Sequence, residues 1–355
     1  MLFRSGNRLF RTIAEEIATL VKKYNGSLSG EHGDGRLRGE FIEQMVGKKN
    51  YQLFKEIKRT WDPENIFNPN KIVDTPSMNT MLRYTPGQQT PNFKTVFRFH
   101  NQDVLQHAEQ CNGSGDCRKT HLSGGTMCPS FMASRDEKDT TRARANILRE
   151  FLTHSNKTNR FDHKEIYEVM ELCLSCKGCK SECPSNVDVA KLKAEFLQHY
   201  YDANGTPFRS KLVGNFAAQM KLAAVFRPVY NFIFGTPALR KLANRVVGFH
   251  PDRTMPLLGN VQLNTWHQKR KVQNTRKVYF FCDEFTNFLD SSIGQKAILL
   301  LERLGYEVVI PEHLESGRSY LSKGLLRKAA EIANQNISLL SHLVSNEVPI
   351  VGIEP

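Results

Sequence analysis

The sequence predicts a multidomain, predominantly α-helical protein whose last part is a small α/β domain. A length of 355 residues suggests two or three domains, since one domain has roughly 100–200 residues. Apolar residues recur at helical spacing in several segments, and only after residue 277 do short apolar strands alternate with helices. The composition, 40% hydrophobic and 24% charged, excludes a disordered or collagen-like chain.

Residues 1–74 form the first predicted unit. A helix is expected over residues 5–24, with Gly26 ending it as a C-cap. One face of this helix carries Leu9, Ile13, Ile17, Leu20 and Val21. After a glycine-rich stretch, residues 27–41, a second helix runs to Trp61, and Asp-Pro and Asn-Pro turns end the unit.

Three regions without predicted strands follow. Residues 75–100 are rich in Pro, Thr, Gln and Asn and are predicted to be a linker. Residues 101–204 are helix-rich and hold seven of the eight cysteines. Residues 205–276 form a basic helical segment that Pro228 and Pro237 interrupt.

Residues 277–355 are predicted to be an α/β domain. Strands are expected at 278–283, 306–311 and 349–353, with helices at 291–305 and 324–346. This order predicts parallel strands joined by right-handed crossovers. Since a parallel sheet normally has both faces covered, and no covering element follows the last strand, the domain is expected to be truncated.

The positive charge is concentrated in one segment. The formal net charge is +13, but residues 205–277 contain 13 Lys and Arg against the single acid Asp252, a net charge of +12. A nucleic-acid-binding protein that is basic throughout is thereby excluded. Basic helices with interleaved apolar residues suit an anionic membrane surface or an acidic protein partner. The alternative is core-packing helices with a solvated basic face.

No leader or membrane-spanning segment is predicted. No stretch approaches ~18 uninterrupted apolar residues, and Arg4, Arg8 and Arg11 interrupt the apolar run that a signal peptide needs. We therefore expect a cytoplasmic protein, with peripheral contact to the inner membrane face through residues 205–277 as a further expectation. Without export, the cysteines are interpreted as metal or redox ligands rather than disulfides.

The strongest chemical signal is the motif Cys173-x2-Cys176-x2-Cys179-x3-Cys183-Pro184. This is the spacing of bacterial ferredoxins that bind [4Fe–4S] clusters, in which the fourth cysteine ligates the other cluster. A zinc site is the alternative, because thiolates also bind zinc tetrahedrally. The compact array followed by proline favours an iron–sulfur cluster, and so an electron-transfer role.

An imperfect copy of this motif lies upstream, Cys111-x2-Ser114-x2-Cys117-x10-Cys128-Pro129, with Ser114 in place of the middle cysteine. If, as in those ferredoxins, the fourth cysteine of each motif ligates the cluster of the other motif, Cys128 completes the cluster of the downstream triplet. Alternatively, Cys183 completes it.

In the exchanged arrangement, Cys111, Cys117 and Cys183 form a second site with only three thiolates. Such a site could hold a three-iron cluster, use an oxygen ligand or be empty. The eighth cysteine, Cys282, lies in a predicted strand and is interpreted as a buried small hydrophobe.

The segment Gly30-Glu31-His32-Gly33-Asp34-Gly35 places two carboxylates and an imidazole among glycines. It is not a nucleotide-phosphate loop, because the GxGxxG spacing is absent and the acids would repel phosphate. Glu31 and His32 could bind a divalent metal or take a proton from a substrate hydroxyl. The alternative is a surface turn.

Several segments resemble a known family. GSLSGEHGDGRLRGEF and WDPENIFNPNKIVD are similar to the C-terminal end of the substrate domain of FAD-linked 2-hydroxy-acid dehydrogenases, which share the vanillyl-alcohol-oxidase flavin fold. CNGSGDCRKT, GTMCPSFMASRDEKDTTRARANILR and CLSCKGCKSECPSNVDVAKLKAEFL resemble a fused ferredoxin-type domain. Bacterial fusions of this type include D-2-hydroxyglutarate and D-lactate dehydrogenases, and the resemblance covers nearly the whole chain.

The resemblance implies roles for individual residues. Glu31 matches the family's metal-ligating glutamate, and His32 matches the histidine beside the substrate hydroxyl. Asn68 and Lys71 match a terminal segment near the flavin, in which Asn70 replaces the usual glycine and is expected to loosen the turn.

The implied architecture has three parts. Residues 1–74 would be a partial α+β flavin-oxidase C-terminal segment, and residues 101–204 an α-helical ferredoxin-type [4Fe–4S] domain. Residues 277–355 resemble a truncated α/β CCG-like domain, with Glu315-Ser316-Gly317-Arg318 in place of its paired cysteines. Since the family's FAD-binding domain lies upstream, the chain is expected to be a fragment that is inactive alone.

The implied function is the iron–sulfur electron-transfer portion of an FAD-dependent D-2-hydroxy-acid dehydrogenase. It would pass electrons from the oxidation of D-lactate or D-2-hydroxyglutarate to a quinone or protein acceptor. The first alternative is a free-standing ferredoxin-like subunit that docks on a separate flavoprotein. The second is a zinc-stabilised interaction protein.

Overall fold

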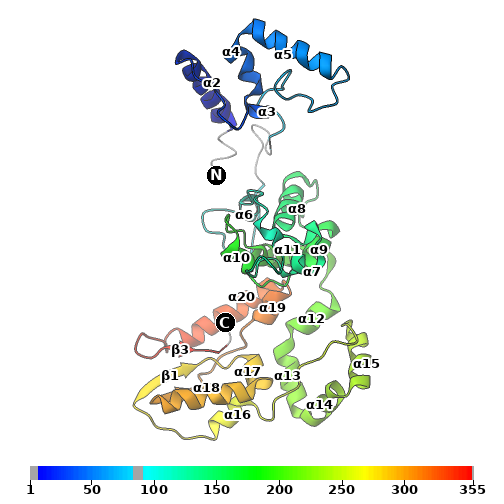
Figure 1. Cartoon of the computed structure of the whole chain (residues 1–355). Coiled ribbons are helices and arrows are strands. Elements are labelled where there is room, and N and C mark those ends of the chain that lie inside the picture. Colours follow the sequence, from blue (N-terminus) through cyan, green and yellow to red (C-terminus); the bar gives the residue numbers. More distant parts are fainter. Residues whose placement is uncertain (1–6, 83–90, 354–355) are drawn as a thin grey trace. The chain divides into compact units, whose positions relative to one another are not determined.

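A computed structural model describes residues 7–82 and 91–353. The chain divides into two compact units, Met1–Pro91 and Asn92–Pro355 (Figure 1). Within the described ranges helices predominate, and a single three-stranded sheet occurs near the carboxyl end. The expectation of a mostly helical, multidomain chain is therefore confirmed.

The first unit is a small group of helices. They are α2 (Asn7–Lys23), α3 (Gly35–Arg38), the 3-10 turn η1 (Gly39–Phe41), α4 (Ile42–Val46) and α5 (Lys48–Trp61). Two small apolar clusters hold it together, one around Phe41 and Ala18 and one around Ile42 and Tyr51. The predicted apolar face of α2 lies outside these clusters. Four residues of this face are 47–60% exposed: Leu9, Ile13, Ile17 and Leu20.

The carboxyl end of α2 differs from the sequence prediction in one detail. Asn25, not Gly26, takes the left-handed conformation, with φ +52°. The backbone N–H of Gly26 then donates to the carbonyl of Val21 at 2.9 Å. Asparagine tolerates this conformation better than most residues, so it replaces glycine at the cap.

The second unit begins with helices packed around α11. They are α6 (Val104–Glu109), α7 (Pro129–Ser134), α8 (Thr141–His154), α9 (Lys164–Glu171), α10 (Gly178–Glu182) and α11 (Val189–Asn204). Ten of the 16 residues of α11 are buried. The buried Glu195 carboxylate accepts the backbone N–H groups of Val96 and Phe97 at 2.8 and 2.9 Å, so the end of the predicted linker packs on this helix.

The basic segment is helical, as the sequence predicts. It contains α12 (Phe208–Gly214), α13 (Phe216–Val225), α14 (Arg227–Gly235), α15 (Pro237–Val247) and α16 (Leu263–Gln268). Pro228 and Pro237 lie in the first turns of α14 and α15, where a missing N–H costs no helical hydrogen bond. In the part of the chain that the structure describes, no helix is long and apolar enough to cross a bilayer.

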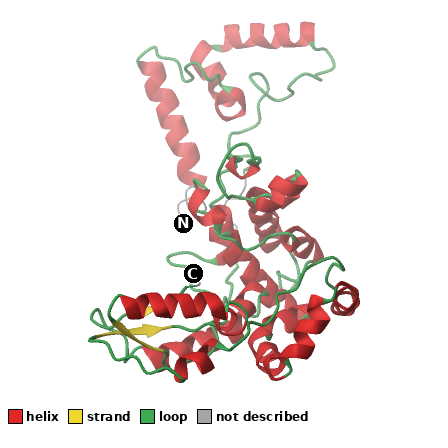
Figure 2. Cartoon of the chain, turned by 60° about the horizontal axis from the view of Figure 1, so that its bottom comes forward, coloured by secondary structure: helices red, strands yellow, loops and turns green. Residues whose placement is uncertain are grey.

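The carboxyl-terminal part contains the sheet, whose strand order is β2-β1-β3. The strands are β1 (Arg276–Phe280), β2 (Tyr306–Val309) and β3 (Ile350–Val351), and both pairings are parallel, as predicted. The helices here are α17 (Glu284–Phe288), α18 (Ser291–Arg303), α19 (Arg318–Ser322) and α20 (Leu326–Leu340). Figure 2 shows the strands in yellow with helices beside them.

The sheet has a compact apolar core. Phe280, Ile298 and Val308 are at most 5% exposed, and Cys282 packs with them, as predicted for a small hydrophobe. β1 ends earlier than expected because Asp283 caps α17, accepting the backbone N–H groups of Phe285 and Thr286. Where the CCG-like module would carry paired cysteines, Ser316 instead donates its backbone N–H and hydroxyl to Glu284.

Candidate functional site

Cysteines from both motifs line one pocket in the second unit. They are Cys128, Cys173, Cys176 and Cys179. Cys128 directly precedes α7, Cys173 and Cys176 lie between α9 and α10, and Cys179 lies in α10. Cys183 is not among the residues that line this pocket. Of the two candidates for the fourth position, the fold therefore brings Cys128 to the downstream triplet.

The backbone around this pocket is unusual at three positions. Cys128, Ser175 and Lys177 all line the pocket and have φ values of +55°, +56° and +60°. Non-glycine residues rarely adopt this conformation, which costs roughly 1–3 kcal/mol each and persists only where surrounding contacts impose it. Such conformations are common in ligand-binding loops. Here they turn the two cysteine segments around the pocket.

Two helix N-termini point N–H groups at the sulfurs. Cys128 Sγ accepts the backbone N–H of Thr141, the first residue of α8, at 3.1 Å. Cys179 Sγ accepts the backbone N–H of Val189, the first residue of α11, at 3.4 Å. The N-terminus of a helix carries partial positive charge and favours a thiolate over a thiol.

Burial acts in the opposite direction and favours the neutral thiol. Desolvation raises the pKa of Cys179 to about 11 and also raises the pKa of Cys128. Metal coordination deprotonates a thiol outright, so loading this site releases protons.

Glu182 ties the two cysteine segments together. Its carboxylate accepts the backbone N–H groups of Thr126 and Met127 at 2.6 and 3.1 Å, and the Thr126 hydroxyl at 2.7 Å. These hydrogen bonds, with Thr126 contributing most, lower the pKa of Glu182 to about 2. The loop that ends at Cys128 is thereby attached to α10. Sequence reasoning missed this role, since an acid inside a cysteine motif has no partner that local spacing reveals.

His107 and Asp188 hold the start of α11. His107 Nε2 accepts the backbone N–H of Asp188 at 3.0 Å, and burial lowers the pKa of His107 to about 4, so the imidazole is neutral and can accept. The Asp188 carboxylate caps α11 by accepting the N–H of Lys191 and pairs with Lys177 Nζ at 3.1 Å. Lys177 lines the pocket, so this network connects the helix with the pocket wall.

Cys111 and Cys117 lie together against α8. Cys117 Sγ accepts the backbone N–H of Arg142 at 3.4 Å, and Cys111 Sγ lies 3.8 Å from Asn146 Nδ2 one turn later. Both cysteines are buried, whereas Ser114, which replaces the middle cysteine, is exposed. Cys183 packs, half-buried, against the same apolar core.

The donor set of the pocket fits a thiolate-bound group, since its only metal-binding side chains are four cysteines. Four cysteines spread around one cavity, with N–H groups on two of the sulfurs, are what a larger thiolate-bound cluster requires.

The amino-terminal candidates lie at the surface of the first unit. Glu31 and His32 precede α3, with side chains 88% and 84% exposed and 3.5 Å between Oε1 and Nε2. Lys71 Nζ lies 3.5 Å from Asn68 Oδ1, and both residues are exposed. In the described part of the chain, no hydrogen bond or ion pair joins these two pairs. Asn70 takes φ +60°, a conformation that asparagine tolerates in place of glycine.

Comparisons with known proteins agree with the two-part organisation. Residues 4–72 match the family model for the C-terminal domain of FAD linked oxidases. Residues 110–188 match the model for a 4Fe-4S dicluster domain, and this range contains all four cysteines of the pocket. No solved structure matches the chain at a significant level.

Relatives cover almost the whole chain. The chain is 25% identical to a D-2-hydroxyglutarate dehydrogenase of Escherichia coli K12 and 27% identical to one of Pseudomonas putida KT2440, each over 98% of its length. A D-lactate dehydrogenase of Archaeoglobus fulgidus is 27% identical over 21% of the chain and 16% of its own length. The chain spans only 38% of the length of the first two. The resemblance noted in the sequence is confirmed by these matches.

Proposed function

We propose that this chain, with its FAD-oxidase C-terminal and 4Fe-4S domains, is the iron–sulfur electron-transfer portion of an FAD-dependent D-2-hydroxy-acid dehydrogenase. One observation carries the proposal: cysteines from two motifs share a pocket inside the segment that matches a 4Fe-4S dicluster domain. The names of the relatives supply the substrate class, D-2-hydroxyglutarate or D-lactate. The acceptor would be a quinone or a protein.

Cys128, Cys173, Cys176 and Cys179 would hold the main cluster. Such a [4Fe–4S] group, when bound, carries one electron at a time. The backbone N–H groups of Thr141 and Val189 would stabilise the negative charge on its thiolates, and hydrogen bonds to sulfur are one determinant of cluster potential. Glu182 would keep the segment of Cys128 in position for ligation.

Cys111, Cys117 and Cys183 would form the second site. With Ser114 in the place of a fourth thiolate, this site would hold a three-iron cluster, take an oxygen ligand or be empty. The common contact of Cys111 and Cys117 with α8 supports grouping these two. The assignment of Cys183 to them follows from the exchange of fourth cysteines in two-cluster ferredoxins.

In this proposal, substrate oxidation takes place beside a flavin bound mainly by another part of the protein. His32 would lie next to the substrate hydroxyl, and Glu31 would help hold a divalent metal that orients the hydroxy acid. Asn68 and Lys71 would contact the flavin. All four are exposed in the first unit and so are accessible to groups outside it. The exposed apolar face of α2 offers a surface that a flavin-binding part could cover.

A free-standing ferredoxin-like subunit that docks on a separate flavoprotein is the second candidate. The match of residues 4–72 to an FAD-oxidase domain favours a single protein, because an electron-transfer subunit has no use for that domain. Turnover would belong to the full-length protein.

The proposal predicts a brown protein after anaerobic purification or reconstitution. We expect broad absorbance near ~400 nm and about four iron and four sulfide per occupied main site, since a [4Fe–4S] group carries that content. A colourless protein that retains zinc would contradict it. With added FAD, dye reduction driven by D-lactate or D-2-hydroxyglutarate in the isolated chain would contradict the assignment of flavin binding to another part of the protein.

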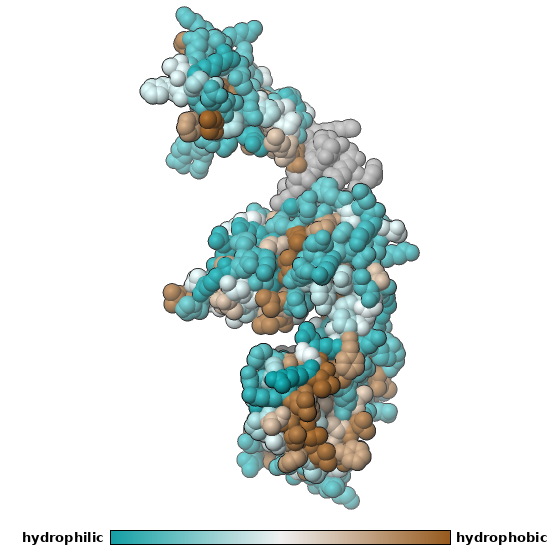
Figure 3. Space-filling model, turned by 90° about the vertical axis from the view of Figure 1, so that its right-hand side faces the viewer, coloured by the Kyte–Doolittle hydropathy of each residue, from teal (hydrophilic) through white to brown (hydrophobic). Residues whose placement is uncertain are grey.

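The basic segment supports a further part of the proposal, contact with an anionic membrane surface by an otherwise cytoplasmic protein. Eight apolar side chains in the segment from α12 to α15 are 56–76% exposed: Phe208, Leu222, Val225, Phe226, Val229, Phe232, Leu242 and Val246. Figure 3 shows the side of the chain on which these helices lie, and apolar residues, in brown, gather on its lower part. The sole acid of residues 205–277, Asp252, is already paired with Lys241 at 2.9 Å. Exposed apolar and cationic groups together suit anionic lipid better than water.

Cosedimentation with vesicles containing phosphatidylserine tests this contact. Lys221 and Arg245 are exposed, and neither forms an ion pair with a described residue. The double variant Lys221→Gln/Arg245→Gln should bind about thirtyfold more weakly, because each basic residue near the surface contributes about 1 kcal/mol. The control Lys48→Gln/Lys49→Gln removes equal charge from the first unit and should have no effect. Absence of binding at low salt, or binding that the double variant retains, would contradict the contact.

A further inference from the structure

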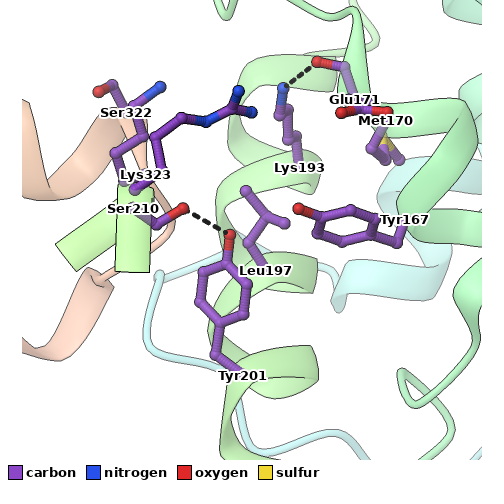
Figure 4. Close-up of a pocket in the computed structure, with 10 residues that line it drawn as sticks. Tyr167, Met170, Glu171, Lys193, Leu197, Tyr201, Ser210, Ser322 and Lys323 are labelled. Carbon is purple, nitrogen blue, oxygen red and sulfur yellow. Dashed lines mark hydrogen bonds between the residues drawn. The ribbon is translucent and has the colours of Figure 1, made fainter. Parts of the chain in front are cut away.

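A second pocket lies along α11, beyond the first turn that lines the cysteine pocket. It is a cavity of about 80 Å³ between α9, α11, α12 and the end of α19. Its wall includes three cationic side chains, Lys193, Arg209 and Lys323, and four hydroxyl groups, those of Tyr167, Tyr201, Ser210 and Ser322. Figure 4 shows Lys193, Tyr167 and Tyr201 extending from neighbouring helices into this space.

Lys193 is a buried cation without a carboxylate partner. It is 9% exposed, and its ammonium donates to the backbone carbonyls of Glu171 at 3.3 Å and Cys173 at 2.6 Å. An ammonium has three N–H donors, so one donor remains beyond these two bonds. Burying a charge that no anion balances costs free energy.

Lys323 and Arg209 add to this positive charge. The Lys323 side chain is half-buried and forms neither a hydrogen bond nor an ion pair with any residue in the described ranges. The Arg209 guanidinium donates to the backbone carbonyl of Gly248 at 3.1 Å, which leaves its other N–H donors for the pocket. After burial, Arg209 is the largest cause that lowers the pKa of Lys323, so the two cations lie close enough to repel each other.

Little negative charge is available in the pocket to compensate. The only carboxylate among the described lining residues belongs to Glu171, which is exposed. The hydroxyls of Tyr201 and Ser210 are 3.3 Å apart and are further hydrogen-bonding groups at the wall. A buried cation is normally paired, so Lys193, with two further cationic side chains at the same cavity and no carboxylate on its ammonium, indicates a site for an anion.

We propose that this pocket binds a small oxyanion, a carboxylate or phosphate group, held by Lys193, Arg209 and Lys323. The cavity has the volume of two to three water molecules at roughly 30 Å³ each, which suits one such group rather than a nucleotide. The Tyr201 and Ser210 hydroxyls bond to each other, which leaves one of their O–H groups to donate to a remaining oxygen of the anion. Through the bond from Lys193 to the Cys173 carbonyl, the anion lies one side chain away from the cysteine segment of the first pocket.

Titration calorimetry of the whole chain tests the site, with inorganic phosphate in one arm and D-lactate or D-2-hydroxyglutarate in the other. Ionic strength is held constant with chloride. We expect one saturable site per chain for at least one of these anions, and the arm that saturates identifies phosphate or carboxylate as the ligand group.

Two variants locate the binding. Lys323→Gln and Arg209→Gln each remove one charged donor and should weaken binding about tenfold or more. The control Lys211→Gln removes an exposed charge from the same helix as Arg209 and should leave binding unchanged. Circular dichroism of each variant verifies folding, and both variant residues are at least partly exposed. No saturable binding in either arm, or binding that both variants retain, would overturn the proposal.

A second readout concerns the neighbouring cluster and rests on the proposed function. Binding of an anion near Cys173 should shift the reduction potential of a bound cluster to more negative values, because added negative charge disfavours reduction. The shift should be absent in Lys323→Gln. If calorimetry detects the anion but no cluster is present, the proposed function fails while the anion site stands.

Discussion

Replacing Cys128 by serine is expected to abolish the main iron–sulfur cluster, although Cys128 lies outside the compact downstream motif. Its sulfur accepts the N–H of Thr141 and lines the same pocket as Cys173, Cys176 and Cys179. Serine keeps the size of the side chain but removes a thiolate ligand. Loss of a residue that only hydrogen-bonds to a metal ligand lowers metal affinity about ten- to hundredfold. Loss of the ligand itself should therefore reduce cluster occupancy at least about tenfold.

Two further cysteine variants make this result specific. Cys183→Ser should retain the main cluster, because Cys183 does not line the pocket. Cys282→Ser changes a cysteine in the apolar core of the sheet and should leave the iron content unchanged. The measurements are iron and sulfide per chain and the absorbance of anaerobically reconstituted protein. A cluster that survives in Cys128→Ser and is lost in Cys183→Ser would reverse the assignment.

Replacing Arg144 by methionine is expected to destabilise the second unit by about 3–5 kcal/mol, the usual cost of removing one partner of a buried ion pair. Arg144 and Asp139 are 2% and 1% exposed, and Nη2 lies 3.3 Å from Asp139 Oδ1. The same guanidinium donates to Ser130 Oγ at 2.9 Å and to the Val169 carbonyl at 3.0 Å. The variant would leave the Asp139 carboxylate buried without its charge partner.

The free energy of unfolding, measured by urea denaturation, checks this expectation. The double variant Arg144→Met/Asp139→Leu removes both charges and should recover part of the loss. Arg149→Met, on the same helix, breaks a pair at 3.8 Å with the exposed Glu150 and a hydrogen bond of 2.7 Å to Asn146 Oδ1, and should cost about 1–2 kcal/mol. Equal effects of Arg144→Met and Arg149→Met would show that the buried pair does not stabilise the fold. Arg144 also lines the cysteine pocket, so cluster loading should fall with stability.

Local patterns in the sequence were sufficient for much of the secondary structure. Helical periodicity predicted the helix of residues 5–24, and α2 spans Asn7–Lys23 within the described residues. Alternating apolar segments predicted three parallel strands, which form the β2-β1-β3 sheet. The boundaries were less predictable, because they depend on caps such as Asp283, whose side chain turns the chain into α17 before the expected strand ends.

Burial and long-range contacts were not predictable in the same way. The apolar face of α2 was identified correctly, yet its exposure depends on what packs there and not on the periodicity itself. Glu182 hydrogen-bonds to residues more than 50 positions away, and nothing local marks it as the link between two cysteine segments. The cations of the second pocket come from three separate helical regions and are unremarkable one by one.

The sequence by itself determined which residues are able to ligate a cluster, where the helices and strands lie, and that the excess charge belongs to residues 205–277. Spacing and periodicity are properties of neighbouring residues, and local sterics and hydrogen bonding decide them. Only the tertiary structure decided that Cys128 rather than Cys183 lines the pocket of the downstream triplet, and that Lys193, Arg209 and Lys323 share one cavity. Those placements depend on the packing of α8, α10 and α11 and on loop contacts between distant segments, which no local pattern encodes.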